Sequence, residues 1–380
     1  MEPIYLDHAA TTPVRDEVRE AMQPFWSERY GNPSSAHRWG REARAALEDA
    51  RERIAAVLGA RRHEIVITGC GTESDNIAVL GGWRRAGRRD ASVVCCSANE
   101  HKAVLLAAKA RHADGAPLTL LGVDADGRVD PGLVDEAIAS NPAIISVMWG
   151  NNEVGTIEPI AEIGRRCRDA GVPFHTDAVQ AFGKVRVRVD ETPCDLLALS
   201  AHKFGGPKGT GILYVRDGIE IAPLEYGGGQ ERRLRPGTEN VAAAVGMAVA
   251  AEMAAAEQEH EAVRLAGLRD ALERAILDAV PDASVNGGAR RLPHILNVSI
   301  PRIDQESLLV ALDIEGIAVS VASACQSGAA EPSHVLAAMG RVLEDGATIR
   351  ISLGWTTRAQ DIDRAADVIP SVAARALAVA

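Results

Sequence analysis

Between about residue 45 and residue 215, short uninterrupted apolar runs alternate with longer stretches of helical character. Strands that lack an alternation of polar and apolar residues are buried on both faces, and the intervening helices cover those faces. The pattern therefore predicts an α/β fold with a mostly parallel sheet. The expected strands are residues 63–68, 91–97, 143–149, 172–177, 196–200 and 211–215, and the expected helices are 70–82, 101–110 and 160–171.

The alternation of apolar runs and helical stretches ends before residue 238, and a different sequence pattern follows. Residues 239 to about 280 form one alanine-rich helical stretch, for which Thr238 is the expected N-cap. The long helix is the natural connection to a second, smaller α/β unit. That unit is predicted from apolar segments at residues 294–300, 307–316, 317–323 and 348–354.

Composition narrows the class of protein. A chain of 380 residues with 47% hydrophobic and 24% charged residues is typical of a globular protein with two domains. Its net charge of −11 argues against direct nucleic-acid binding, and the basic stretch 84–89 is either a local patch or a solvated loop. We expect no membrane span and no secretory signal, since neither apolar pattern is present. The six cysteines lack C-x-x-C spacing, so a cytoplasmic location with reduced thiols is expected.

Polar residues follow the ends of several predicted strands. Ligands of open parallel sheets bind at the carboxyl ends of the strands, so these residues are expected to meet at one edge. Gly71 and Thr72 lie at a helix start, where backbone N–H groups and the helix dipole favour a phosphate. The other residues of the set are His101, Asn152, Asp177, Gln180, Ser200, His202 and Lys203.

Each of these residues also has a simpler explanation. Taken alone, Asp177 is more typical of an N-cap than of a catalytic acid, and Thr72 is typical of a cap as well. His101 alone is typical of a half-buried histidine. Their convergence favours a site for pyridoxal 5'-phosphate (PLP), which requires a lysine, a carboxylate opposite its ring nitrogen and an anion-binding helix start.

Lys203 is the lysine that fits such a site. The chain has five lysines among 41 basic residues, so solvated positive charge is mostly carried by arginine. Lys203 ends an apolar strand, and the glycine-rich segment "GGPKGTG" that follows allows close backbone approach. Lys102 and Lys109 fall in a predicted helix, and Lys184 and Lys208 fit the role less well.

The chain resembles the cysteine desulfurases of the NifS/IscS type, which are fold-type-I PLP enzymes of the class V aminotransferase family. The resemblance runs along the whole chain and includes "YLDHAATTP", "GNPSSAHRWG", "GTESDN", "NEHKAV", "HTDAVQAFGK", "SAHKFGGPKGTG", "RPGTEN" and "TIRISLG". It implies a large PLP-binding domain of residues 14–255 with a mostly parallel seven-stranded sheet. It also implies a small domain, made of residues 1–13 and 256–380, that carries the catalytic cysteine.

The resemblance assigns roles around the cofactor. Lys203 corresponds to the lysine that carries PLP and moves the Cα proton of the substrate, and His101 corresponds to the histidine that stacks on the ring. Asp177 corresponds to the partner of the ring nitrogen, and Gln180 to the donor to the ring oxygen. A homodimer is implied, because one phosphate ligand comes from the second subunit. The implied ligands of the phosphate are Gly71, Thr72, Ser200, His202 and, from that second subunit, Thr238.

The resemblance also implies a substrate and a reaction. The substrate is L-cysteine, and the groups that hold its carboxylate are Asn32, Asn152 and Arg350. A planar guanidinium suits this task because it donates two parallel hydrogen bonds. Cys325, in "SACQSGAAEPSHV", corresponds to the thiol that takes the sulfur as a persulfide for an acceptor protein and leaves L-alanine. Relatives often have threonine or serine after this cysteine, whereas this chain has Gln326.

Other functions stay open at this level. An aminotransferase or a selenocysteine lyase would use the same cofactor residues, whereas a non-catalytic sulfur-relay scaffold would need none of them. A metal site of His101, His175, His202 and a cysteine lacks standard ligand spacing, so no metal is expected. The destination of the sulfur is open among iron–sulfur cluster assembly, tRNA thiolation and sulfur modification of DNA.

Overall fold

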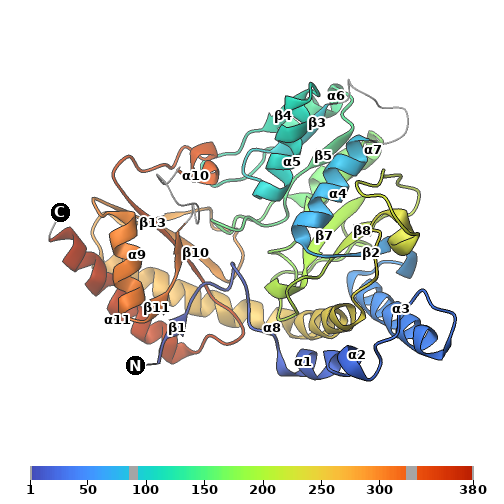
Figure 1. The fold of residues 1–380 in the computed structure, drawn as a ribbon. Coiled ribbons are helices and arrows are strands. Elements are labelled where there is room, and N and C mark those ends of the chain that lie inside the picture. The colour runs from blue at the N-terminus through green and yellow to red at the C-terminus, as the bar shows by residue number, and fades with distance from the viewer. Residues whose placement is uncertain (1, 85–92, 322–331, 379–380) are drawn as a thin grey trace.

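The structure is a computed structural model that describes residues 2–84, 93–321 and 332–378. It has one lobe around a seven-stranded sheet and another around a four-stranded sheet (Figure 1). Helix α8 (Val241–Ala279) runs beneath both lobes. The predictions made for Cys325, for Gln326 and for most of the basic stretch 84–89 lie outside the described residues.

The seven-stranded sheet confirms the predicted mostly parallel arrangement. Its strand order is β2-β8-β7-β6-β5-β3-β4. The strands from β4 to β7 are parallel neighbours, whereas β8 runs antiparallel to both β7 and β2. The strands are β2 (Ile65–Thr68), β3 (Val94–Ser97), β4 (Leu118–Leu121), β5 (Ile144–Ser146), β6 (Phe174–Asp177), β7 (Leu196–Ser200) and β8 (Gly211–Val215).

The predicted strands agree with the structure to different degrees. Strands β7 and β8 have the predicted bounds, whereas β2, β5 and β6 are shorter than predicted. Strand β6 begins after Pro173 rather than at Val172, because proline has no N–H to donate to a ladder. Strand β4 was not predicted, since it lies at the edge of the sheet and is a short, partly exposed run.

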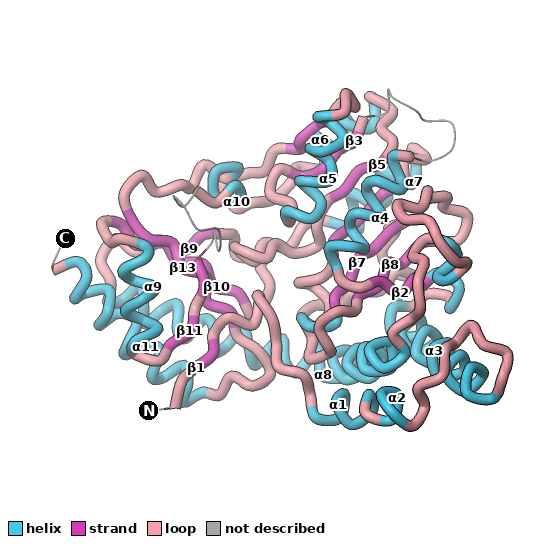
Figure 2. Tube along the Cα trace, in the orientation of Figure 1, coloured by secondary structure: helices cyan, strands magenta, loops and turns pink. Residues whose placement is uncertain are grey.

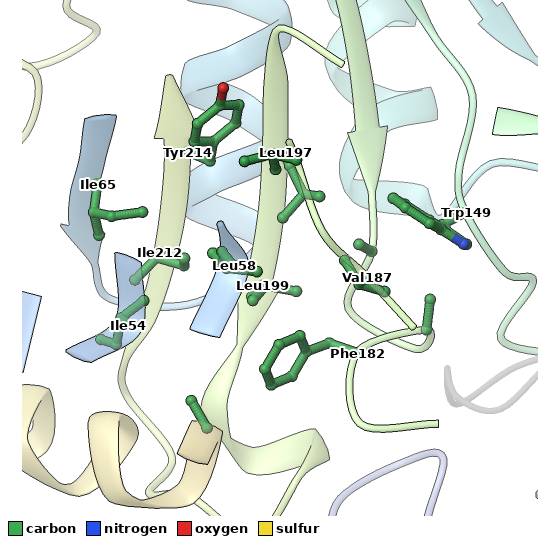
Figure 3. Close-up of a cluster of buried hydrophobic side chains, with 14 of the residues drawn as sticks. Ile54, Leu58, Ile65, Trp149, Phe182, Val187, Leu197, Leu199, Ile212 and Tyr214 are labelled. Carbon is green, nitrogen blue, oxygen red and sulfur yellow. The ribbon is translucent and has the colours of Figure 1, made fainter. Parts of the chain in front are cut away.

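The strand residues alternate between two hydrophobic cores, which explains their unbroken apolar sequences. Ile65 of β2 faces one core and its neighbour Val66 faces the other. Figure 3 shows part of the first core, where Leu197 and Ile212 of the sheet lie near Leu58 of α3. Helices α3, α6, α7 and the first half of α8 pack on that core, and α4 and α5 pack on the other. The helices of this lobe are α1 (Asp16–Met22), α2 (Pro24–Ser27), α3 (Arg38–Leu58), α4 (Gly71–Trp83), α5 (Lys102–Ala113), α6 (Pro131–Ala139) and α7 (Ile160–Asp169).

Helix α8 contributes to the cores of both lobes. Its first half, from Val241 to Ala254, is buried against the large sheet, whereas Leu265 and Ile276 are buried in the core of the small lobe. Among the described helices, α8 alone has the length and hydropathy of a membrane span. Most of that apolar window is buried inside the protein, so α8 is a core helix shared by two lobes.

The start of α8 differs from the prediction. Thr238 is exposed and does not cap the helix. The N-cap is Asn240, whose side chain accepts a hydrogen bond from the N–H of Ala243. Asparagine caps as well as threonine, and the helix begins after the two polar residues that follow Thr238.

The small lobe confirms the predicted second α/β unit. Its antiparallel sheet has the order β12-β13-β10-β9, and a separate parallel pair joins β1 to β11. Helix α10 packs on Val154 of the large lobe. The elements are β1 (Ile4–Tyr5), β9 (Ser284–Asn286), β10 (Ile295–Pro301), α9 (Gln305–Ile314), β11 (Ile317–Ala318), β12 (Ser320–Val321), α10 (His334–Ala338), β13 (Gly346–Ser352) and α11 (Ala359–Leu377).

The N-terminal segment passes between the two lobes as a loop from β1 to α1 (Figure 2). Ile4 and Leu6 are buried in the core of the small lobe, and Ala9 is buried in that of the large lobe. The domain limits at residues 13/14 and 255/256 stay a prediction.

A buried ion pair fixes the loop that precedes α8. Glu231 accepts hydrogen bonds from both terminal nitrogens of Arg51 at 2.6 and 2.7 Å and from the N–H of Ile67 at 2.7 Å. The side chains of Glu231 and Arg51 are 2% and 9% exposed, so water does not screen them. Glu231, Arg232 and Arg233 have positive φ angles, and such residues persist only where the surroundings hold them.

We predict that Glu231→Gln lowers the free energy of unfolding by about 3–5 kcal/mol, because it removes the carboxylate that is bonded to the buried Arg51 guanidinium and leaves the guanidinium with the more distant, partly exposed Glu48. Urea unfolding followed by circular dichroism measures the loss. The matched control is Glu191→Gln, which breaks an exposed pair with Arg186 and should cost at most about 1 kcal/mol. Equal losses in the two variants would contradict the role given to the buried pair.

Candidate active site

A cavity of about 340 Å³ opens at the carboxyl ends of the parallel strands. Its size is in the range of pockets that hold small ligands. It brings together ten of the residues predicted for the site. They are Gly71, Thr72, His101, Asn152, Asp177, Gln180, Ser200, His202, Lys203 and Arg350.

Two of the predicted residues do not line this cavity, and one is not described. Asn32 is exposed, and its side chain accepts a hydrogen bond from the N–H of Ser34 in its own turn. Thr238 is exposed on the loop before α8. Cys325 lies outside the described residues.

Lys203 reaches the cavity from a short 3-10 turn (Ala201–Lys203) that follows β7. Its Nζ donates to the backbone carbonyls of Ala9 and Ala10, the latter at 2.9 Å. Burial, followed by the positive charge of Arg350, lowers the pKa of Lys203 to about 8. A much larger fraction of this amine is therefore unprotonated near neutral pH than for an ordinary lysine, as a nucleophilic amine requires.

Asp177 and His101 lie on the floor of the cavity. Asp177 ends β6, and its Oδ1 accepts a hydrogen bond from the N–H of Val179 at 2.8 Å. Burial raises the pKa of Asp177, and the nearby His101 and Lys203 oppose that rise. His101 caps α5 by accepting from the N–H of Ala103 through Nδ1, and burial lowers its pKa. Asp177 is therefore held by a turn rather than acting as a helix N-cap, whereas His101 does cap a helix, and both side chains line the cavity.

The start of helix α4 forms an anion-binding corner. The N-cap Cys70 accepts the N–H of Glu73 through its sulfur, and Gly71 at the helix start lies beside Ser200, whose hydroxyl is buried without a hydrogen-bond partner. A Cβ at Gly71 would lie 2.9 Å from a methyl of Val179, so only glycine lets the backbone approach this closely. A phosphate at this corner would give Ser200 the partner it lacks.

Gln180 and Arg350 are oriented by contacts that the sequence did not reveal. The amide nitrogen of Gln180 donates to the carbonyl of Ala9 at 2.8 Å, which leaves one of its two N–H groups for a ligand. Arg350 donates to Asp7 Oδ1 at 2.8 Å and to the backbone carbonyl of Asn152 at 3.0 Å. Asp7 therefore holds the guanidinium at the wall of the cavity.

Sequence reasoning missed several lining residues. The most important is Asp75, which lies on α4 three residues after Thr72 and therefore on the same helix face. That spacing was the available signal. The other missed residues are Ala9, Ala10, Cys70, Met148 and Val179.

The metal site that was weighed from the sequence does not form among the described residues. His175 is buried and bonds to Ser146, away from His202. The potential ligand atoms of Asp75, His101 and Asp177 do lie within 4.8 Å of one another. Nδ1 of His101 is occupied by its capping bond, so only Nε2 of this histidine is left for a ligand.

These residues fit PLP. The cavity supplies a lysine amine of lowered pKa, a buried carboxylate for the ring nitrogen and a helix start with an unpartnered hydroxyl for the phosphate.

Comparisons with known proteins agree with this fit. Residues 4–365 match the family model described as aminotransferase class-V. The chain is 45% identical over 371 residues to the cysteine desulfurase IscS of Dictyoglomus turgidum, covering 97% of this chain and 94% of that one. A solved NifS-like protein has a TM-score of 0.91 at 36% identity, covering 98% of this chain and 100% of that chain. The structure described as SspA in complex with cysteine has a TM-score of 0.79 at 37% identity, covering 92% and 98%.

We predict that the apoprotein reacts with PLP at a rate that rises with pH around a midpoint near 8, where Lys203 loses its proton. Stopped-flow absorbance of the bound cofactor measures the rate at each pH. Arg350→Gln should move the midpoint upward, because it removes a positive charge and frees the negative charge of Asp7 beside the lysine.

Arg358→Gln is the matched control for that experiment, since Arg358 lies on the surface and bonds to Asp361. It should leave the midpoint unchanged. A wild-type midpoint at the ordinary lysine value of about 10.4 would contradict the lowered pKa of Lys203.

Proposed function

The chain belongs to the class V aminotransferase family, and from that premise we propose that it is a PLP-dependent cysteine desulfurase. The observation that carries the proposal is the single cavity in which Lys203, Asp177 and the start of α4 meet. The relatives at 43–45% identity over nearly the whole chain are named cysteine desulfurases. A structural neighbour at 37% identity is described as a complex with cysteine.

The residues of the cavity have different proposed roles around the cofactor. Bound PLP supplies an electron sink for the substrate's Cα electrons when its ring nitrogen is protonated. Asp177 would hold that nitrogen protonated through its carboxylate. Lys203 would carry the cofactor and then take the proton from Cα, which its lowered pKa permits near neutral pH. His101 would cover one face of the ring.

Arg350 is the proposed site for the carboxylate of L-cysteine. It lines the cavity, and its Nε is buried without a hydrogen-bond partner. Asp7 and the carbonyl of Asn152 occupy its terminal nitrogens and fix the plane of the guanidinium. A carboxylate that binds Arg350 would therefore meet an oriented donor rather than a flexible one. Asn152, which also lines the cavity, is a proposed partner of the same carboxylate, whereas the exposed Asn32 does not reach this cavity in its own chain.

Cys325 is the proposed sulfur acceptor. Its thiolate attacks the sulfur of L-cysteine, so that an S–S bond forms as the substrate C–S bond breaks. The carbon fragment takes up protons and leaves as L-alanine, and Cys325 keeps a persulfide for an acceptor protein. Burial raises the pKa of the thiols of Cys95, Cys167 and Cys194 to between about 11 and about 12, so these thiols suit packing better than attack.

A homodimer is also proposed. The exposed Thr238, on a loop anchored by Glu231, is available to a second copy of the chain and not to its own cavity. We propose a cytoplasmic enzyme without direct nucleic-acid binding, consistent with the net charge of −11. The relatives include proteins named IscS, NifS and SspA, so iron–sulfur assembly and sulfur modification of tRNA or DNA remain alternative destinations.

We predict that wild type releases equal amounts of alanine and sulfide from L-cysteine with a reductant, whereas Cys325→Ala loses at least about 10²-fold in rate, as expected when a nucleophile is removed. Alanine is measured by chromatography and sulfide by methylene blue. Cys70→Ser, which replaces the described thiol that lines the cavity but keeps a capping side chain at the start of α4, is the control and should retain activity. Both variants should keep the visible absorbance of bound PLP.

Full activity of Cys325→Ala would overturn the desulfurase mechanism. If that variant still released sulfur from L-cysteine or selenium from L-selenocysteine, the chain would be a lyase of the same cofactor class. Transfer of the amino group to an oxo acid would instead make it an aminotransferase.

The role of Thr238 gives a second prediction. Lys203→Ala and Thr238→Ala should each impair the enzyme, but a mixture refolded together should regain activity, because the mixed dimer contains one site with both residues intact. Activity and PLP retained after gel filtration are measured for each variant and for the mixture. A mixture no more active than its parts would place Thr238 in the site of its own subunit.

A further inference from the structure

Four buried polar side chains form a chain beside Asp177 that the proposed reaction does not use. They come from different elements: Asp75 from α4, His175 from β6, Ser146 from β5 and Glu100 from the turn after β3. Each side chain is between 0% and 1% exposed. Buried polar groups of this kind must satisfy one another, because water cannot reach them.

The distances join the four residues in one line. His175 Nδ1 lies 2.8 Å from Ser146 Oγ, and Ser146 Oγ lies 3.2 Å from Glu100 Oε1. At the other end, His175 Nε2 lies 3.5 Å from Asp75 Oδ1. Nε2 of His175 and Oδ1 of Asp75 are both buried without a hydrogen-bond partner, and the 3.5 Å between them is somewhat longer than a normal hydrogen bond.

This row of four buried side chains can hold its protons in only a few positions. Burial lowers the pKa of His175 to about 3, so the ring is neutral and carries one N–H. If Ser146 donates to Glu100, the N–H of His175 is on Nδ1 and donates to Ser146. His175 Nε2 is then an acceptor, and it faces an oxygen that can satisfy it only if Asp75 carries a proton.

The reverse direction would place a negative charge on Asp75. His175 would then donate to Asp75 through Nε2, and Glu100 would need a proton to donate to Ser146. The carboxylate of Asp75 would lie within 4.8 Å of that of Asp177. Two ionised carboxylates at that distance in a buried site repel strongly, so only one of them ionises readily.

Of the two carboxylates, Asp177 is the one that ionises more readily. It accepts the N–H of Val179 at 2.8 Å, and His101 and Lys203 lie close enough to favour its ionised form. For Asp75, by contrast, burial raises the pKa well above its ordinary value, and the neighbouring acids raise it further. The titratable groups that face Asp75 are Cys70, Glu100, His101, His175 and Asp177.

We infer that Asp75 is a further positioning residue of the cofactor site, a neutral carboxylic acid that donates to His175 and leaves Asp177 as the ionised carboxylate opposite the cofactor ring. The role rests on the proposed function only in its reference to PLP. His175 and Asp177 share one face of β6, so the chain of hydrogen bonds supports the strand that presents Asp177.

The test compares Asp75→Asn with wild type by infrared difference spectroscopy and by cofactor binding. At about pH 7 wild type should show a carbonyl band of a protonated carboxylic acid that Asp75→Asn loses. Glu153 and Glu158, whose pKa burial raises to about 7, contribute bands of their own, which should persist in both proteins. Because a neutral group replaces a neutral group, the Kd for PLP should change by less than about twofold. The midpoint of the pH titration of the bound cofactor's absorbance should move by well under about one unit.

Two controls separate this role from loss of structure. Asp195→Asn removes a buried carboxylate at the opposite end of β7, where it bonds to Arg216, and should leave the band and the titration unchanged. Glu100→Gln should keep the Asp75 band. Circular dichroism and melting temperature report whether each variant folds.

Several results would overturn the inference. They are a carbonyl spectrum of Asp75→Asn identical to that of wild type, a band lost only in Glu100→Gln, and a tenfold weaker Kd for PLP or a shift of about one unit in Asp75→Asn. If Asp75→Asn fails to fold, a wild-type spectrum without the Asp75 band at about pH 7 would itself overturn the inference. None of these measurements needs turnover, so a failure of the desulfurase proposal would leave this test intact.

Discussion

The parallel run of strands from β4 to β7 is the constraint on which the site depends. Every such strand ends at the same edge, so the polar residues that follow each one are forced together there. His101, Asp177 and Lys203 follow or end three different strands of the seven-stranded sheet. The direction of their strands alone brings them to one cavity. The glycines and caps near that edge refine the geometry, but the sheet decides which residues meet.

The N-terminal segment connects this edge to the small lobe. Leu6 is buried in the small-lobe core, and three residues later Ala9 lines the cavity. There Asp7 holds Arg350, and the carbonyls of Ala9 and Ala10 accept from Lys203. The lysine and the arginine are therefore both held by one short loop. Because Arg350 also lowers the pKa of Lys203, the position of the small lobe affects the chemistry of a residue on the large one.

The sequence predicted the parallel sheet, the long helix and nine of the cavity residues, because unbroken apolar runs and polar strand ends are local signals. The tenth, Arg350, was implied only by the family resemblance. It did not predict strand β4, whose partly exposed residues give no such signal at the sheet edge. It placed the start of α8 at Thr238 because capping types are interchangeable between neighbouring polar residues. Asp7 and Asp75 were missed for a different reason. Their importance lies in contacts with residues distant in the chain, which no local pattern contains.

The buried charges of the cavity explain why its residues act as a set. Burial favours the neutral form of every titratable group, and it lowers the pKa of Lys203 and His101 while it raises that of Asp177. Each of these groups is moved back toward its charged form by a neighbour of opposite sign. A ligand with a cationic ring nitrogen and an anionic phosphate would meet Asp177 at one end and the start of α4 at the other. A ligand without that pair of charges would leave both ends uncompensated, so the cavity selects by charge arrangement as well as by shape.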